Sequence, residues 1–311
     1  MTKTILVLGS VNADHVLKVS SFPRPGETIT GSGYEIIPGG KGANQAVACA
    51  RLGGKTRFKA CIGQDAFGNE IISKFAEDDI DTSLIDQIED VNTGVALIFV
   101  DTHAENCIGI SAEANGYLNA ERVAKNSHHI ADADYLLMQL ETPEEAIYAA
   151  AKAGKAGNTE VVLNPAPARP LPDDILACVD MITPNQTEAE VLTGVPVQTP
   201  ENAQKAAAVL HEKGIKTVVI TMGKQGAMIS VKQSGQVECQ MVSSYRVEAT
   251  DTTAAGDTFN GAMLVALSEG KNLLDAVQFG NASAAISVTR SGAQTSIPVR
   301  EEVERFLASQ S

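Results

Sequence analysis

The sequence contains no tryptophan, and only 4% of its residues are aromatic. Basic residues are also scarce: 24 Lys and Arg stand against 38 Asp and Glu, which gives a formal net charge of −14. Nucleic-acid binding needs a basic face, so this charge argues against a nucleic-acid partner. It does not exclude a phosphorylated small molecule, because backbone N–H groups and a metal ion can supply positive charge locally.

Cysteines are few and widely separated. There are five, and no Cys-x-x-Cys occurs, so we expect reduced thiols rather than a disulfide framework or a zinc site. No apolar run approaches the roughly 20 residues that span a bilayer. The first residues lack the basic and then apolar pattern of a secretion signal. These absences predict a cytoplasmic protein with no membrane partner.

The dominant pattern in the sequence is an alternation of apolar, strand-like runs with helix-like stretches. The predicted strands lie at residues 4–9, 58–63, 135–140, 161–163, 181–183 and 217–221. The predicted helices lie at residues 39–52, 66–76, 143–153, 257–268 and 273–289. This alternation predicts an α/β fold with a mostly parallel central sheet flanked by helices. With 44% hydrophobic residues, the 311 residues suffice for a single domain, 1–311.

Two patches break the alternation. Within residues 14–38, and again within residues 94–111, strand-like runs follow one another without a helical period. Consecutive strands that are not separated by a helix favour antiparallel pairing. We therefore expect a small antiparallel β-layer that could cover a site.

Polar residues follow several of the predicted strands. Asn12 and Asp14 follow the first strand, Glu141 follows the strand at 135–140, and Asn185 follows the strand at 181–183. Ligands of parallel sheets bind beyond the carboxyl ends of the strands, so these residues are candidates for a site. Each also has a structural alternative: a polar turn, a helix-start charge or, for Asn185 with Glu188, a capping box.

A run of small residues, Thr253 to Gly256, leads into Asp257 and an apolar, helix-spaced stretch. The pattern predicts a tight loop that opens a helix, with Asp257 in the first turn. Free N–H groups at a helix start attract anions, and small side chains let a phosphate approach them. A carboxylate there can accept the proton of a hydroxyl that attacks the phosphate. Alone, Asp257 could equally be a carboxylate that only stabilises the helix dipole.

Residues 251–264 and 39–53 resemble the two signatures of the ribokinase-like (PfkB) carbohydrate kinases, Asp-Thr-x-[Gly/Ala]-Ala-Gly-Asp and Gly-Gly-x-[Gly/Ala]-x-Asn-x-Ala. The similarity extends from Gly9 to Phe306. The resemblance implies ATP-dependent phosphorylation of a pentose, D-ribose at its 5-hydroxyl. The alternatives are a deoxyribokinase, a fructokinase or an adenosine kinase, and, in another class, a non-catalytic sugar-binding relative.

The resemblance also implies the site residues. Asp257 would be the base, with an anion hole at Ala254, Ala255 and Gly256. The sugar would meet Asn12, Ala13, Asp14, Gly40, Lys41, Gly42, Ala43, Asn44, Glu141 and Asp257. The nucleotide would meet Asn185, Thr221, Met222, Gly223, Lys224, Gln225, Gly226, Gly256, Asp257 and Asn281.

Two metal ions and a subunit contact follow from the resemblance alone. Mg²⁺ would be held chiefly by the phosphates, with Glu188 acting through water. K⁺ would be held by oxygens at Asp251, Thr253, Ser287, Arg290, Gly292 and Ser296. The two β patches would form a lid that pairs with the lid of a second subunit, which gives a homodimer.

Overall fold

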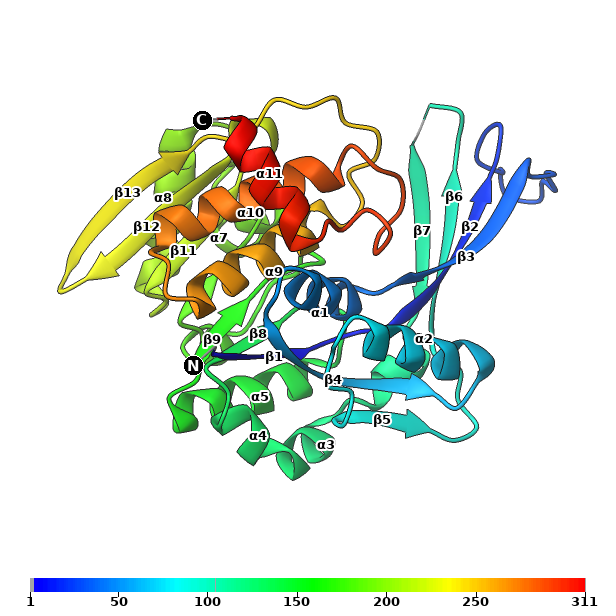
Figure 1. The fold of residues 1–311 in the computed structure, drawn as a ribbon, viewed down its shortest axis with the longest axis horizontal. Coiled ribbons are helices and arrows are strands. Elements are labelled where there is room, and N and C mark those ends of the chain that lie inside the picture. Colours follow the sequence, from blue (N-terminus) through cyan, green and yellow to red (C-terminus); the bar gives the residue numbers. More distant parts are fainter. Residues whose placement is uncertain (1–2, 104, 311) are drawn as a thin grey trace.

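The computed structural model describes residues 3–103 and 105–310, which form two β-sheets and a set of flanking helices (Figure 1). Residue 104, in the second β patch, and residues 1, 2 and 311 of the predicted domain lie outside the described residues. The strands are β1 (Thr4–Leu8), β2 (Asn12–Lys18), β3 (Gly33–Gly39), β4 (Lys55–Gly63), β5 (Ile85–Ile88), β6 (Gly94–Val100), β7 (Asn106–Ser111), β8 (Tyr135–Met138), β9 (Glu160–Leu163), β10 (Met181–Ile182), β11 (Thr217–Thr221), β12 (Ala227–Gln233) and β13 (Gln236–Val242).

The helices connect and cover these strands. They are α1 (Lys41–Arg51), α2 (Ala66–Glu77), α3 (Ala120–Lys125), α4 (Ser127–Ala131), α5 (Glu144–Gly157), α6 (Asp173–Leu176), α7 (Gln186–Thr193), α8 (Pro200–Glu212), α9 (Ala255–Ser268), α10 (Leu273–Ser287) and α11 (Arg300–Ser309). Two 3₁₀ turns, η1 (Glu113–Tyr117) and η2 (Gly223–Gln225), complete the elements. None of the helices in the described part of the chain combines the length and apolar character needed to cross a membrane.

The larger sheet has nine strands in the order β13-β12-β11-β10-β9-β8-β1-β4-β5. Neighbouring strands from β11 to β5 run parallel, whereas β12 and β13 are antiparallel additions at one edge. The predicted mostly parallel sheet is therefore confirmed. All the parallel strands end at the same edge, which gathers the polar residues that follow them.

Helices cover both faces of this sheet, because its central strands are apolar on both sides. In β1, Ile5 and Val7 pack into a core with residues of α1, α9 and α10. Leu6 and Leu8 point to the opposite face and pack with residues of α5, α7 and α8. Figure 1 shows α1, α9, α10 and α11 on one side of β1 and α3, α4 and α5 on the other.

The β12–β13 hairpin was not predicted, although the sequence carries a signal for it. Ser234 and Gly235 join the two strands, and both have positive φ angles, 51° and 84°. Two such residues are typical of the tight turns that connect antiparallel strands. A Ser-Gly pair is a recognised turn signal in a sequence.

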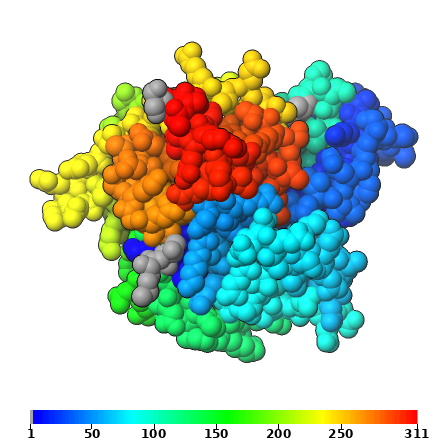
Figure 2. All heavy atoms as spheres, in the orientation of Figure 1, coloured from blue at the N-terminus to red at the C-terminus, as the bar shows by residue number. Residues whose placement is uncertain are grey.

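The two β patches form the second, four-stranded sheet, in the order β3-β2-β6-β7. The outer pairs, β2–β3 and β6–β7, are antiparallel as expected, and the central pair β2–β6 is parallel. This small sheet projects from the body of the molecule, at the upper right of Figure 2. It exposes large apolar side chains at Tyr34, Ile36, Leu97, Ile108 and Ile110.

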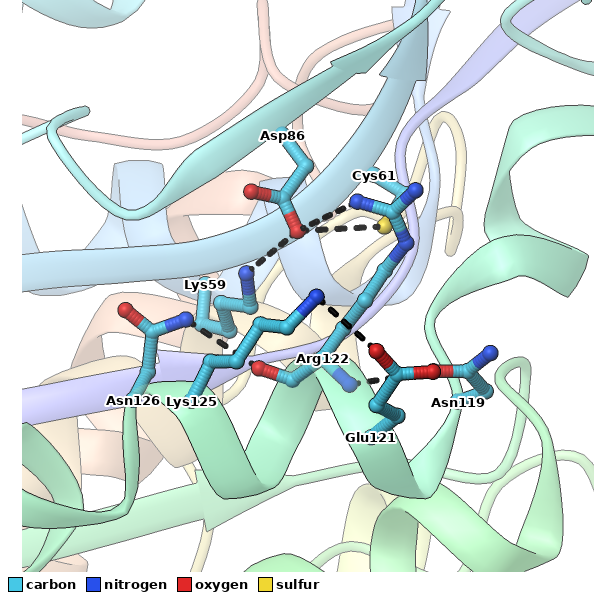
Figure 3. A network of polar contacts seen from close by, with 8 residues as sticks. All are labelled: Lys59, Cys61, Asp86, Asn119, Glu121, Arg122, Lys125 and Asn126. Atoms are coloured by element: carbon cyan, nitrogen blue, oxygen red, sulfur yellow. Dashed lines mark hydrogen bonds and ion pairs between the residues drawn. The ribbon is translucent and has the colours of Figure 1, made fainter.

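A partly buried ion pair links β4, β5 and α3 (Figure 3). Lys59 on β4 is 1% exposed, and its ammonium donates to Asp86 Oδ2 on β5 at 2.7 Å. Arg122 on α3 donates to the same oxygen at 3.2 Å. The Cys61 thiol lies 4.0 Å from it. Asp86 therefore neutralises Lys59, which water cannot reach. Asp86 itself has two cationic partners, Lys59 and Arg122.

This asymmetry predicts unequal effects of removing the two partners. Asp86→Ala strands the Lys59 charge in the interior, so it should lower the free energy of unfolding by about 3–5 kcal/mol. Lys59→Met should cost less, because Asp86 keeps Arg122. The double variant should be more stable than Asp86→Ala alone. Urea denaturation of the three variants measures this, and additive losses would show that the two charges are not coupled.

Candidate active site

The polar residues at the carboxyl edge of the large sheet converge on Asp257. Asp257 is 6% exposed, and its two oxygens accept hydrogen bonds from side chains of α1. Asn44 Nδ2 donates to Oδ2 at 3.0 Å, and Gln45 Nε2 donates to Oδ1 at 2.8 Å. The first turns of α1 and α9, more than 200 residues apart, therefore meet at this carboxylate.

The start of α9 is open to a ligand. Ala254 precedes the helix in the left-handed conformation, with φ of 57°, and no side chain caps the helix. The N–H groups of a first helical turn have no partner within the helix. A Cβ placed on Gly256 would meet no atom within 4 Å, so the fold itself does not demand glycine there. The small residues instead leave space in front of these N–H groups, of which that of Ala255 donates to Thr252 O at 3.3 Å.

Ser10 and Glu141 hold the start of α1 in place. Glu141 Oε2 accepts from Ser10 Oγ at 2.6 Å and from the Lys41 backbone N–H at 3.0 Å. The Ser10 hydroxyl also accepts from the Gly42 N–H, and its carbonyl accepts from the Ala43 N–H. Glu141 therefore caps α1, whereas the structural alternative was a charge at the start of α5.

The glycine pair before α1 permits two close approaches. Gly40 has a φ of 90°, and a Cβ there would lie 2.8 Å from the Asn12 nitrogen. A Cβ on Gly39 would overlap the carboxyl group of Asp14. Side chains at either position would displace β2, which carries Asn12 and Asp14. Ala13 and Ala43, predicted to meet the sugar, are 5% and 0% exposed and belong to the buried apolar residues.

Burial and charge set the protonation of the acidic groups near α1. Burial, together with the charge of Glu141, raises the pKa of Asp14 from 3.8 to about 7. Burial acts to lower the pKa of Lys41, but the charges of Asp257, Glu141, Glu188 and Asp14 outweigh it and raise that pKa. Lys41 thus stays charged among carboxyl groups that it partly neutralises.

Asn185 and Glu188 form the capping box expected as their structural alternative. Glu188 N–H donates to Asn185 Oδ1 at 2.8 Å, and Asn185 N–H donates to Glu188 Oε2 at 2.8 Å. Burial raises the pKa of Glu188. Asn185 also forms a bridge with Thr221, so the starts of α7 and η2 are adjacent. These contacts leave the proposed nucleotide and metal roles untested.

The other predicted nucleotide residues lie around η2 and β13. Met222 is 2% exposed, so its side chain belongs to the core, whereas Lys224 is exposed. Gly226 has a φ of 101°, and a Cβ there would overlap Val242 O. Asn281 donates to the carbonyls of Val242 and Ser243 at 3.3 and 3.2 Å. It thus joins α10 to the end of the hairpin.

The residues predicted for K⁺ lie on the loop before α9, at the end of α10 and on the loop that follows α10, and the two loops contact each other. Asp251 Oδ1 accepts from the Thr253 N–H, and Oδ2 accepts from the Gly292 N–H, both at 2.9 Å. The Arg290 guanidinium donates to both carboxylate oxygens of Glu302. The carbonyl and hydroxyl oxygens of Ser287 and Ser296 are buried. Among the described residues no cluster of three or more His, Cys, Asp or Glu could hold a metal.

Sequence reasoning missed several buried residues that support this site. Gln45 binds Asp257, and Ser10 binds Glu141. Asn115 on η1 donates to Asn12 Oδ1 at 2.8 Å and accepts from the Val11 N–H. Gln45 directly follows the candidate residue Asn44 at the start of the helix, so its place in the sequence could have indicated that it lies near the site. Asn115 comes from a distant polar turn with no local signal.

Known proteins resemble this chain in both sequence and fold. The family model described as pfkB family carbohydrate kinase matches residues 2–300. This chain belongs to that family. The ribokinase of Haemophilus influenzae is 50% identical over 307 residues, which is 99% of each protein. The ribokinase of Staphylococcus aureus is 41% identical and covers 98% of this chain and 100% of its own length.

Solved PfkB-type structures resemble the fold closely. The Arabidopsis thaliana ribokinase, solved with ribose and ATP, superimposes with a TM-score of 0.91 at 32% identity and covers 99% of each chain. The α/β fold and the kinase class predicted from the sequence are thereby confirmed. The individual site residues stay predictions, which the contacts above make specific.

The buried carboxyl group of Asp14 predicts a pH-dependent stability. Because its pKa is raised to about 7, the native state keeps the proton that the unfolded chain, with a pKa of 3.8, releases earlier. The contribution of Asp14 to stability therefore falls as pH rises from about 4 to 7, and Asp14→Asn removes this loss. Relative to wild type, the variant should gain on the order of 3 kcal/mol between pH 4 and pH 8. Urea unfolding at both pH values measures the difference; a constant difference would contradict it.

Proposed function

We propose that this PfkB-family protein phosphorylates D-ribose at its 5-hydroxyl with ATP. The observation that carries the proposal is the uncapped start of α9, where Asp257 stands beside free N–H groups and is held by Asn44. The relatives named ribokinase, at up to 50% identity over nearly their full length, support the choice of sugar.

In this proposal Asp257 takes the proton of the sugar hydroxyl. The hydroxyl oxygen forms a bond to the γ-phosphorus, and the bond from that phosphorus to the oxygen of the leaving ADP breaks. The N–H groups from Ala254 to Asp257 bind the charge that develops on the transferred group. The open space at Gly256 supports this role, because no atom lies within 4 Å of a Cβ placed there.

The sugar would lie between β2 and the starts of α1 and α9. The Asn44 oxygen Oδ1 is buried without a hydrogen-bond partner among the described residues, so it is available to a sugar hydroxyl. Asp14 and Glu141 would accept from further hydroxyls, because carboxylates have several acceptor positions. The backbone between Gly40 and Ala43 would complete the contact.

The nucleotide would extend from α9 past Asn185 and the turn at η2, toward Asn281. Mg²⁺, held chiefly by phosphates and water, would neutralise the β- and γ-oxygens, with Glu188 acting through a water molecule. Both Glu188 oxygens already accept hydrogen bonds from Asn185, which fits an indirect role. K⁺ would lie between the 251–253 and 287–296 loops, which Asp251 and Gly292 connect.

The small sheet would act as a lid on the sugar and would pair two subunits. Strand alternation puts Ile108 and Ile110 on the face that carries Asp14, and Tyr34, Ile36 and Leu97 on the other. Exposed apolar side chains on both faces support the pairing with a second copy. The cytoplasmic location expected from the sequence belongs to the same proposal.

The sugar dependence of ADP release tests the function. In a coupled assay with ATP and Mg²⁺, we expect ribose to give a kcat/KM at least about tenfold above those for deoxyribose, fructose and adenosine, because transition-state contacts to each hydroxyl add discrimination. A higher kcat/KM for deoxyribose, fructose or adenosine would identify that compound as the substrate in place of ribose. ADP release that no member increases would contradict a sugar kinase.

Asp257→Asn should remove most of this turnover. An amide cannot take the hydroxyl proton, so kcat should fall by about 10²–10⁴-fold. ATP binding, measured by calorimetry, should persist, because the N–H groups of α9 remain. Asp275→Asn is the matched control, since Asp275 stands in the first turn of α10. Turnover of Asp257→Asn within a few-fold of wild type would refute its role as base.

A further inference from the structure

Asp257 belongs to a buried network of side-chain amides that the chemistry above does not use. Gln45, 0% exposed, donates through Nε2 to Asp257 Oδ1 at 2.8 Å and to Asn164 Oδ1 at 2.9 Å. Its oxygen Oε1 accepts from Gln139 Nε2 at 2.5 Å. Gln139 follows β8, and Asn164 follows β9. Two strand ends therefore reach the carboxylate through one glutamine.

The network returns to the helix that carries Asp257. Asn164 Nδ2 donates to Thr183 O at 3.1 Å, and Thr183 Oγ1 donates to Asn260 Oδ1 at 2.6 Å. Asn260 Nδ2 then donates to Gly256 O at 2.8 Å, in the first turn of α9. All its side chains are at most 6% exposed. The carboxylate and the backbone next to it are thus fixed to the same frame.

The directions of these hydrogen bonds are determined by groups that can only accept. A carboxylate and a backbone carbonyl have no proton to donate. Asp257 therefore requires the nitrogen end of Gln45, and Thr183 O requires the nitrogen end of Asn164. Once Gln45 is oriented this way, its oxygen faces Gln139, which must present its nitrogen.

Gln139 fixes Gln45 at a cost to its own hydrogen bonding. Gln139 Oε1 is buried and has no hydrogen-bond partner among the described residues. A buried polar atom without a partner destabilises the fold. What Gln139 contributes in return is the hydrogen bond that stops the Gln45 amide from turning its oxygen toward Asp257.

We propose that Gln45 is a positioning residue for the base: its amide orients the Asp257 carboxylate, and Gln139 fixes which end of that amide faces it. The proposal rests on the function proposed above. Gln45 is fully buried and acts through Asp257 rather than on the sugar. It occupies one acceptor position of Oδ1, so the hydroxyl proton goes to a position that Gln45 leaves free.

The test compares Gln45→Met and Gln139→Met with wild type in the ribose- and ATP-dependent assay across pH. Methionine keeps the length of the side chain and removes the donor. We expect kcat of Gln45→Met to fall about 10- to 100-fold, with KM for ATP within about twofold, as for other losses of a group that orients a reacting one. The acid limb of its kcat–pH profile should move to higher pH, because a carboxylate that loses an N–H donor holds a proton more tightly.

Gln139→Met should shift kcat and the acid limb in the same direction by less, since the Gln45 donor remains but is free to rotate. Gln139 does not touch Asp257, so this variant carries the test if Gln45→Met does not fold. Thr159→Val is the matched control: it removes a buried hydrogen bond, to Ile130 O, at the start of β9. It should lower the melting temperature without changing kcat or the pH profile.

Several results would overturn the proposal. If the wild-type protein turns over ribose and Gln45→Met has the same kcat and pH profile, the role proposed for Gln45 is contradicted. The proposed function then still stands. A lower kcat with an unmoved acid limb would show a merely structural role. If the wild-type protein shows no sugar-dependent ADP release, both the proposed function and this inference are contradicted.

Discussion

The site depends on the close approach of two helices, α1 and α9. A Cβ on Gly261 of α9 would lie 2.5 Å from the Cβ of Ala48 on α1, so only glycine allows this spacing. The approach brings the first turns of the helices together, and the amides of Asn44 and Gln45 thereby reach Asp257. A larger residue at position 261 would separate the helices and break both hydrogen bonds. The packing of two small residues therefore sets the geometry of a polar site.

Local patterns predicted the frame of this site. The apolar runs of β1 and β8 predicted strands buried on both faces, and parallel strands end at one edge. Asp14 and Glu141 could be identified because they follow those strands, and Asp257 because small residues precede an apolar helix. In each case the signal lies within one strand or helix and the turn beside it. The arrangement of the candidate residues follows from topology.

The support behind these residues was beyond reach of such patterns. The partners of Gln45 lie 94 to 212 residues away, just after β8, just after β9 and on α9, and no local period reports them. Lys59 looks like a solvent-facing strand residue until Asp86 is placed on the neighbouring strand. The β12–β13 hairpin is different: its turn residues were visible, and only their interpretation was missing. Long-range polar partners, rather than secondary structure, mark the physical limit of the sequence.

The site combines several carboxyl groups with a function that needs a polyphosphate, in a chain of net charge −14. The starts of α1, α7 and α9 differ in how their N–H groups are satisfied. Glu141 satisfies an N–H of α1, and the Asn185–Glu188 box satisfies α7, whereas α9 has no side-chain cap. Burial keeps Asp14 partly protonated near neutral pH, and Lys41 remains charged. Positive charge is thereby concentrated at Lys41 and the start of α9, where the proposed mechanism places the transferred phosphoryl group.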